Sequence, residues 1–152
     1  MYKNKTKSKI AENLLQGMMS NEHQSPPKVA PKIKAAPKIR NMYWCDFPRD
    51  AQLPEFWKRR PVIVVSRIRT LHGAVTVIPC STTPQNENKW AVKLKTSIDG
   101  RESWAVCDKI STLAVSRLVP HSGVVPKLPQ EEFRLVLEKL LEWLPSLPKE
   151  NS

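Results

Sequence analysis

Polar residues that can bind phosphate lie at the ends of three apolar runs in the sequence. Two arginines precede the run PVIVV, three hydroxyl residues follow AVTVIPC, and an aspartate ends SWAVCD: Arg59 and Arg60, then Ser81, Thr82 and Thr83, and Asp108. A guanidinium group can hold two phosphate oxygens, hydroxyl groups can hold others, and a carboxylate can accept a proton. These residue types therefore suit phosphate chemistry. The same positions also suit a charged strand end, a Ser/Thr turn and a capping aspartate.

Other catalytic patterns are weaker in this chain. His23, His72 and His121 lie outside any nucleophile motif. The sequence has no GxSxG motif, no phosphate-binding glycine loop and no paired-histidine metal motif. The arginines, the hydroxyl residues and the aspartate therefore remain the candidates for chemistry.

Five short segments have the apolar or alternating pattern of β-strands, and they are Met42–Phe47, Pro61–Ser66, Ala74–Pro79, Lys89–Lys95 and Ser103–Asp108. Turns at about 8 to 15 residue spacing favour a small barrel. Because antiparallel neighbours bring the start of one strand beside the end of the next, we expect Arg60 and the Ser81–Thr82 pair to share one rim.

The chain is predicted to divide into an arm, one domain and a tail. Residues 1–40 are Lys/Pro-rich and are expected to be a disordered basic arm, with one short amphipathic helix over Lys7–Met19. Residues 41–146 are expected to form the barrel domain, and residues 147–152 a short tail. An apolar stripe at i, i+3, i+4, i+7, i+8 and i+11 predicts a C-terminal helix over Glu131–Leu144, which must cover one face of the sheet.

Charge and composition limit the partners. The chain carries 25 Lys and Arg against 14 Asp and Glu, a net charge of +11, and residues 1–40 hold +7 of it. This balance favours a polyanionic partner such as RNA, DNA, anionic lipid or an acidic protein. Three widely spaced cysteines and the lack of a long apolar segment or a secretory signal lead us to expect a reduced protein of the cytoplasm, without a membrane anchor.

Several blocks together resemble a known family. In order, MYWCDF, RRPVIVVS, VTVIPCSTTP, WAVCDKISTL and the helix after RLVP are similar to the PemK/MazF (Kid) toxins of bacterial toxin-antitoxin pairs. The similarity covers residues 41–144 and leaves out the arm. The chain departs from the family pattern at Val106, where an arginine is often found two residues before the aspartate.

The resemblance implies a fold, a reaction and a set of partners. The fold would be mainly β with α, a small SH3-like antiparallel barrel, forming a homodimer. The activity would be that of an endoribonuclease without metal or cofactor, which cuts single-stranded mRNA to 2′,3′-cyclic phosphate and 5′-hydroxyl ends and so inhibits translation. The partner would be a cognate acidic antitoxin. Arg60 would stabilise the charge of the phosphorane and assist proton transfer, Ser81 or Thr82 would hold a phosphate oxygen, and Asp108 would activate the 2′-hydroxyl.

Further residues near the expected rim are candidates for binding RNA. Trp57 can stack an unpaired base, and cationic or hydroxyl side chains can contact phosphates: Lys58, Arg59, Arg67 and Thr83. Trp90 is better explained as a core residue, since apolar Val92 and Leu94 follow it at every second position of the expected strand. A rival hypothesis is a non-catalytic barrel that binds nucleic acid or an acidic protein mainly through its basic arm.

Overall fold

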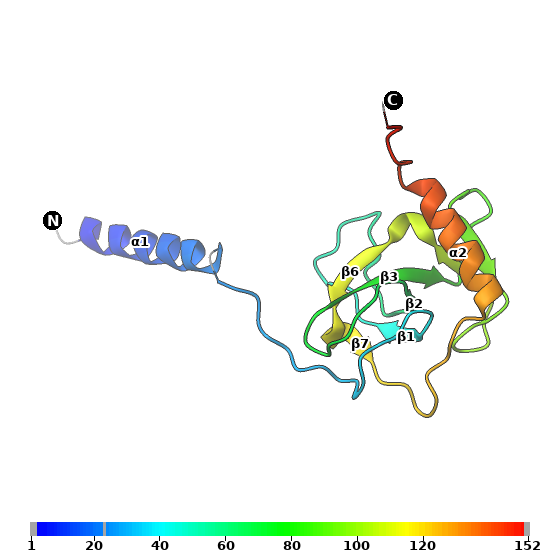
Figure 1. Cartoon of the computed structure of the whole chain (residues 1–152). Coiled ribbons are helices and arrows are strands. Elements are labelled where there is room, and N and C mark those ends of the chain that lie inside the picture. The colour runs from blue at the N-terminus through cyan, green and yellow to red at the C-terminus, as the bar shows by residue number, and fades with distance from the viewer. Residues whose placement is uncertain (1–2, 23, 151–152) are drawn as a thin grey trace.

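The computed structural model describes residues 3–22 and 24–150. The described elements follow one another as α1 (Lys3–Glu22), β1 (Met42–Cys45), β2 (Arg60–Val64), β3 (Ala74–Ser81), β4 (Ala91–Leu94), β5 (Ser103–Val106), the 3-10 helix η1 (Cys107–Lys109), β6 (Ser111–Ala114), the 3-10 helix η2 (Val115–Arg117), β7 (Leu118–Val119) and α2 (Gln130–Trp143). Figure 1 shows the strands gathered in one domain, with α2 along its side and α1 standing apart.

The strands form one antiparallel sheet with the order β4-β5-β3-β2-β1-β7, and β6 pairs with β3. The long strand β3 organises it: Ala74 to Val77 pair with β6, Val77 to Pro79 pair with β2, and Cys80 and Ser81 pair with β5. The prediction of a mainly antiparallel β fold with a C-terminal helix is confirmed. The predicted closure into a barrel is not seen, because β4 and β7 end the strand order without pairing to each other.

Two apolar clusters cover the two faces of the sheet, as the strand alternation requires. Ile63 and Ile78 point to the face that α2 covers, where Phe133, Val136 and Leu140 complete the cluster. On the other face, neighbouring residues of the same strands pack together, and this cluster includes Cys45, Phe47, Val62, Val64, Val75 and Val77. The predicted helix Glu131–Leu144 therefore covers the sheet as expected, with bounds shifted by one residue at each end.

All five predicted strands are present, with ends that differ by a few residues. The segment Ser103–Asp108 stops as a strand at Val106, because residues 107–109 turn into η1. Two strands, β6 and β7, were not predicted from the sequence. β6 reads STLA, with too few apolar positions to signal a strand, and β7 has only two residues; both are held by pairing with distant strands, β3 and β1.

The arm differs from its description in the sequence analysis at both ends. The helix spans Lys3–Glu22 rather than Lys7–Met19. Residues 24–30 are exposed and irregular, but the ordered domain begins before Asn41. Ile33 is buried in the same cluster as Val62, and the Arg40 amide donates to the carbonyl of Val64. The apolar residues between the prolines therefore anchor the last part of the predicted arm on the domain.

The three cysteines are buried and have unreactive thiols. Cys45, Cys80 and Cys107 are free and buried, and burial raises the pKa of each thiol to about 12. The thiols therefore stay protonated near neutral pH and act as small apolar core residues. Neither helix in the described part of the chain is long and apolar enough to cross a membrane.

Candidate active site

The two adjacent arginines at the start of β2 have different surroundings. Arg59 binds the carboxylate of Asp46 through two hydrogen bonds, Nε to Oδ1 at 2.6 Å and an Nη to Oδ2 at 3.1 Å. Lys32 donates to the same carboxylate at 3.4 Å. The hydrogen bond from Arg59 lowers the pKa of Asp46. The charge of Arg59 is thus balanced by a structural ion pair.

Arg60 points to the other face of the strand. It lies opposite Cys45 in β1 and on the same face of β2 as Val62 and Val64, which belong to the cluster away from α2. Its guanidinium carbon lies 3.8 Å from the centroid of the Phe56 ring. Its Nε is buried and has no hydrogen-bond partner within residues 3–22 and 24–150. Burial lowers the pKa of Arg60, but an arginine remains charged at neutral pH.

A second cation meets Arg60 at the same phenylalanine. The Nζ atom of Lys109 lies 4.4 Å from the centroid of the Phe56 ring and donates a hydrogen bond to the carbonyl of Pro54. Phe47 packs edge-on against Phe56, with 6.5 Å between the ring centroids, and fixes the ring. Neither cation forms an ion pair with another described residue. Two uncompensated cations at one ring favour an anionic ligand.

A cleft of about 790 Å³ opens beside these residues. Residues 47–56 form one wall and residues 108–113 form the other. Its lining mixes apolar and charged side chains, and the charged ones are Asp50, Glu55, Asp108 and Lys109. Carboxylates repel phosphate but accept hydrogen bonds from sugar hydroxyls and base amino groups. The cations at Phe56 can hold a phosphate while the cleft receives the rest of a nucleotide.

Asp108 is held in place within the cleft wall. It sits in η1, and its Oδ1 accepts a hydrogen bond from Nδ2 of Asn88 at 3.1 Å. The Asn88 side chain is fixed in turn, because its Oδ1 accepts from the Trp90 amide at 3.0 Å. Asp108 forms no ion pair with a described residue, so its carboxylate keeps lone pairs free to take up a proton. No group of three His, Cys, Asp or Glu side chains in the described chain could hold a metal ion.

The hydroxyl residues lie at the end of β3. Val62 pairs with Pro79, and extending this register by two residues puts Ser81 opposite Arg60 on the same face of the sheet. Ser81 is only 5% exposed, and its Oγ accepts a hydrogen bond from the Thr83 amide at 3.2 Å. Thr82 and Thr83 are exposed. The strand register therefore brings the end of β3 beside Arg60, as the sequence analysis expected of the rim.

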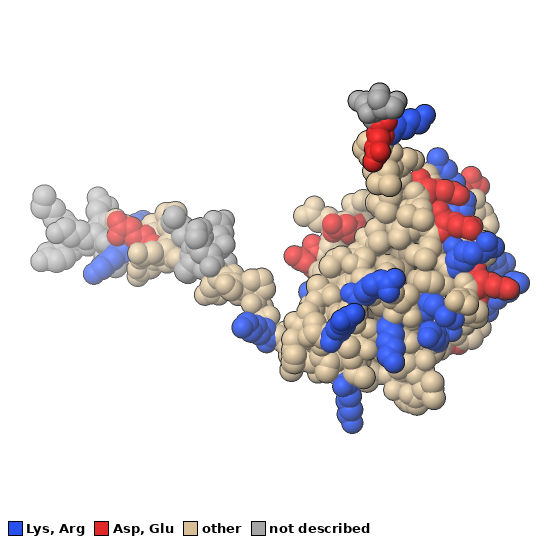
Figure 2. Space-filling model, in the orientation of Figure 1, with Lys and Arg blue, Asp and Glu red and all other residues tan. Residues whose placement is uncertain are grey.

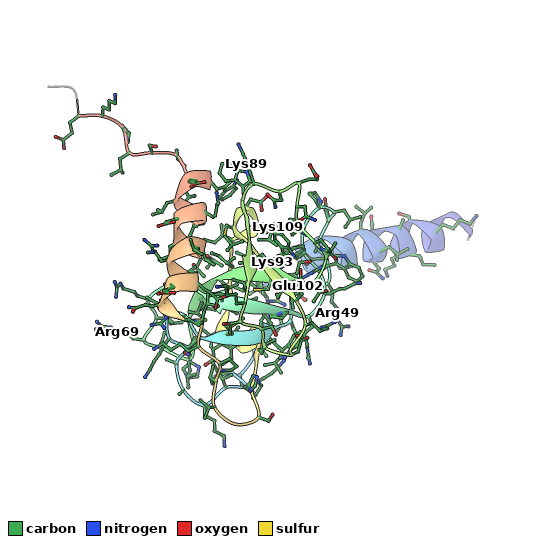
Figure 3. The ribbon with its side chains drawn as sticks, turned by 90° about the vertical axis from the view of Figure 1, so that its right-hand side faces the viewer. Arg49, Arg69, Lys89, Lys93, Glu102 and Lys109 are labelled. Atoms are coloured by element: carbon green, nitrogen blue, oxygen red, sulfur yellow. The ribbon has the colours of Figure 1, made fainter. Side chains whose placement is uncertain are left out.

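The predicted RNA-binding residues do not all gather here. Trp57 and Lys58 follow Phe56 and are exposed, with Lys58 Nζ 4.9 Å from the Trp57 ring centroid. Arg59 is occupied by Asp46. Arg67 lies beyond the opposite end of β2, so the structure separates it from the cleft. Figure 3 shows Arg69 and Arg49 on opposite sides of the domain.

Three residues of the site were missed from the sequence. Phe56 and Lys109 form the cation site, and Asn88 positions Asp108. Lys109 directly follows the predicted Asp108, so its place in the sequence could have marked it as a candidate. Phe56 and Asn88 lie in irregular segments without periodicity, and their roles depend on tertiary contacts that the sequence does not encode locally.

Comparison with solved structures places this fold among known ones. A MazF structure from Deinococcus radiodurans matches with a TM-score of 0.56 and 18% identity, covering 72% of this chain and 96% of that one. The toxin MazF-mt6 of Mycobacterium tuberculosis matches with a TM-score of 0.51 and 20% identity, over 68% and 95% of the two chains. An endoribonuclease in complex with its cognate antitoxin, from a mycobacterial species, gives 0.52 and 18%, over 74% and 100%.

At the level of sequence, none of the curated proteins is similar enough to count as a relative. The family comparison is decisive, because residues 38–144 match the PemK-like, MazF-like toxins of type II toxin-antitoxin systems. The match includes both cations at Phe56, Ser81 and Asp108, and it begins three residues before Asn41, within the segment that the structure anchors on the sheet. The chain therefore belongs to the family of PemK-like, MazF-like toxins.

Proposed function

We propose that this protein is an endoribonuclease toxin that cuts single-stranded RNA without a metal, leaving 2′,3′-cyclic phosphate and 5′-hydroxyl ends. One observation carries the proposal. Arg60 and Lys109 meet at Phe56 without a carboxylate partner among the described residues, beside a cleft that holds Asp108. We infer that the ribose next to a phosphate held at these cations enters the cleft. Cutting mRNA in this way stops translation and growth.

The reaction assigns one role to each group. The Asp108 carboxylate takes the proton of the 2′-hydroxyl, and the 2′-oxygen forms a bond to the adjacent phosphorus. The bond from phosphorus to the 5′-oxygen breaks, this oxygen takes a proton from water to become the free hydroxyl, and the proton held by Asp108 passes to the solvent. Arg60 and Lys109 stabilise the negative charge that develops on the phosphorane oxygens, and Ser81 or Thr82 holds one of these oxygens.

Lys109 also accounts for a departure from the family pattern. The position two residues before Asp108 is Val106, which is fully buried and apolar. Lys109 follows Asp108 directly and brings a cation to the same cleft. The charge that the pattern places before the aspartate is therefore supplied after it.

An acidic antitoxin peptide is the proposed protein partner. Two of the similar structures are complexes, the mycobacterial endoribonuclease with its antitoxin and MazE-MazF of Deinococcus radiodurans. A carboxylate of such a peptide would satisfy Arg60 in place of the phosphate and so block the site. We extend the proposal to a homodimer acting in the cytoplasm.

The test is cleavage of a mixed-sequence single-stranded RNA by the purified full chain in the presence of EDTA, with analysis of the fragment ends. Cyclic phosphate and 5′-hydroxyl ends support the proposal. Intact RNA that is nevertheless bound would support the rival, a binding domain without catalysis.

A further inference from the structure

Exposed cations gather at the end of β2 that lies away from the cleft. Three segments meet there. The Arg40 amide donates to the carbonyl of Val64, the Val64 amide donates to the carbonyl of Asn41, and Asn41 forms a bridge to Lys127. The loop after β2 adds Arg67 and Arg69. We call the exposed cations of these segments, Lys38, Arg67, Arg69 and Lys127, the distal basic surface.

Within residues 3–22 and 24–150, no carboxylate forms an ion pair with this surface. Residues 23–45, 56–86 and 109–130, which contain all four cations, hold no Asp or Glu. In the described structure the four side chains form no ion pair, whereas Arg59, Lys93 and Arg101 each bind a carboxylate. Figure 2 shows Lys and Arg without Asp or Glu over the part of the domain where Figure 1 labels β1 and β2. The positive potential there is therefore uncompensated.

The distal basic surface is separate from the cleft. Arg67 follows Arg60 by seven residues, which span at most about 23 Å at about 3.3 Å per residue of extended chain. Figure 3 shows Arg69 on the side of the domain opposite Arg49, whose loop borders the cleft. A phosphate held at Arg60 cannot reach these cations, but a phosphate several nucleotides away can.

Residues 32–40 lie between the two sites and also carry cations. Lys32 binds Asp46 beside Arg59, and the chain then runs to Arg40 at the Val64 end of β2. Ile33 and Ile39 pack this stretch onto the sheet, so it spans the domain from the Arg59 end to the distal end. Exposed Lys34 and Lys38 lie along it. The surface between the sites is therefore also basic.

We propose that the distal basic surface binds the phosphate backbone of RNA that flanks the cleaved nucleotide. The proposal rests on the proposed function and names a second contact for the same substrate. It predicts that affinity depends on RNA length, because only a strand that extends past the cleft reaches the second contact. RNA is preferred to an acidic peptide as the occupant, since an RNA strand that leaves the cleft carries one phosphate per nucleotide and each contact with a cation adds to its affinity.

The test compares two variants of the full chain that lose the same charge. Arg67→Gln/Arg69→Gln/Lys127→Gln removes three cations of the distal basic surface. Lys93→Gln/Arg101→Gln/Lys149→Gln removes three exposed cations elsewhere. Binding is measured by fluorescence anisotropy with 2′-O-methyl RNA of about 5 and about 25 nucleotides, lengths chosen around the usual site sizes of single-strand binders. This RNA has no free 2′-hydroxyl, so binding is read whether or not the protein cleaves.

The expected result is selective. The distal variant binds the long RNA roughly tenfold more weakly or worse, and its salt slope falls by about 2, since each lost contact to single-stranded RNA removes about 0.7. The short RNA binds as to the unmodified protein, and the control variant behaves like the unmodified protein with both RNAs. Arg67→Lys/Arg69→Lys/Lys127→Arg keeps the charge and restores long-RNA binding, which excludes a folding defect.

Three outcomes would overturn the proposal. Equal weakening by the distal and control variants would mean that only net charge matters. Equal weakening of short and long RNA would place the effect in the cleft. Unchanged RNA binding with lost binding of a poly-glutamate peptide would assign the surface to an acidic protein. If the unmodified protein does not cleave RNA but its binding of long RNA still depends on the distal cations, the proposed function is contradicted and this inference stands.

Discussion

Arg60 lies over the ring of Phe56, with its guanidinium carbon 3.8 Å from the ring centroid and no carboxylate partner among the described residues. Arg59, one residue earlier, is bound to Asp46. Strand alternation sends the two side chains to opposite faces, so one arginine stabilises the structure and the other remains available to an anion.

Removing the Phe56 ring is expected to impair catalysis without unfolding the protein. Phe56→Ala leaves Arg60 and Lys109 without the ring that holds them, and cleavage should slow about 3- to 30-fold, the range expected for a lost cation–π contact. Phe56→Tyr keeps the ring and should restore the rate. Leu53→Ala, an exposed position in the same loop, serves as the control. An Ala variant as fast as the unmodified protein would contradict the positioning role.

Neutralising Asp108 is expected to remove the proton acceptor. Asp108→Asn can still accept a hydrogen bond from Asn88, but it cannot take the 2′-hydroxyl proton, so single-turnover cleavage should fall about 100-fold or more. Binding of 2′-O-methyl RNA should stay unchanged. A variant with normal single-turnover rates would assign proton transfer to another group.

The attacking 2′-hydroxyl can be tested from the side of the substrate. An RNA with one deoxynucleotide on the 5′ side of the cleaved bond should remain uncut at that bond, because no oxygen is present to attack the phosphorus. Cleavage at neighbouring bonds and binding should be unaffected. Mapping the fragments on a sequencing gel measures this, and cutting at the deoxy position would indicate attack by water.

Much of the fold could be predicted from the sequence, because most of its elements show an apolar pattern within their own segment. The five predicted strands and α2 all rest on apolar periodicity, which survives in the structure. Strands β6 and β7 could not be found, since they are short and are held by partners far away in the chain. The anchoring of Ile33 likewise depends on a surface that exists only in the folded sheet.

The candidate site was predictable in part for the same reason. Strand order and alternation place Arg60 beside the end of β3. Only the family resemblance separated Arg60 from Arg59 in the sequence, because their structural difference depends on Asp46 and Phe56, which come from other segments. Arg67 was expected to bind RNA with the others, but the length of β2 carries it to the far end of the sheet.

Glu132 should link stability to pH. Although burial raises the pKa of this carboxyl, hydrogen bonds from the Thr96 hydroxyl and from the amides of Lys95 and Thr96 outweigh it and lower the pKa. A lowered pKa means stability that is present above about 4.5 and is lost as the pH falls through the folded value.

The variant Glu132→Ala measures this contribution. We expect it to lower the free energy of unfolding by about 1–2 kcal/mol at pH 7, since the site is only partly buried. The difference from the unmodified protein should shrink towards zero near pH 3. Denaturant unfolding at both pH values gives the answer, with the exposed Glu131→Ala as control. A difference independent of pH would mean that packing rather than charge is lost.

The most direct measurement of the central claim compares Arg60→Ala with Arg59→Ala in RNA cleavage with EDTA present. Both variants lose one arginine at the same place in the chain, but only Arg60 is free to bind phosphate. We predict that Arg60→Ala loses cleavage by about 100-fold or more, while Arg59→Ala still produces cyclic phosphate ends at a rate near that of the unmodified protein. Equal loss in both variants, or full activity of Arg60→Ala, would contradict the account.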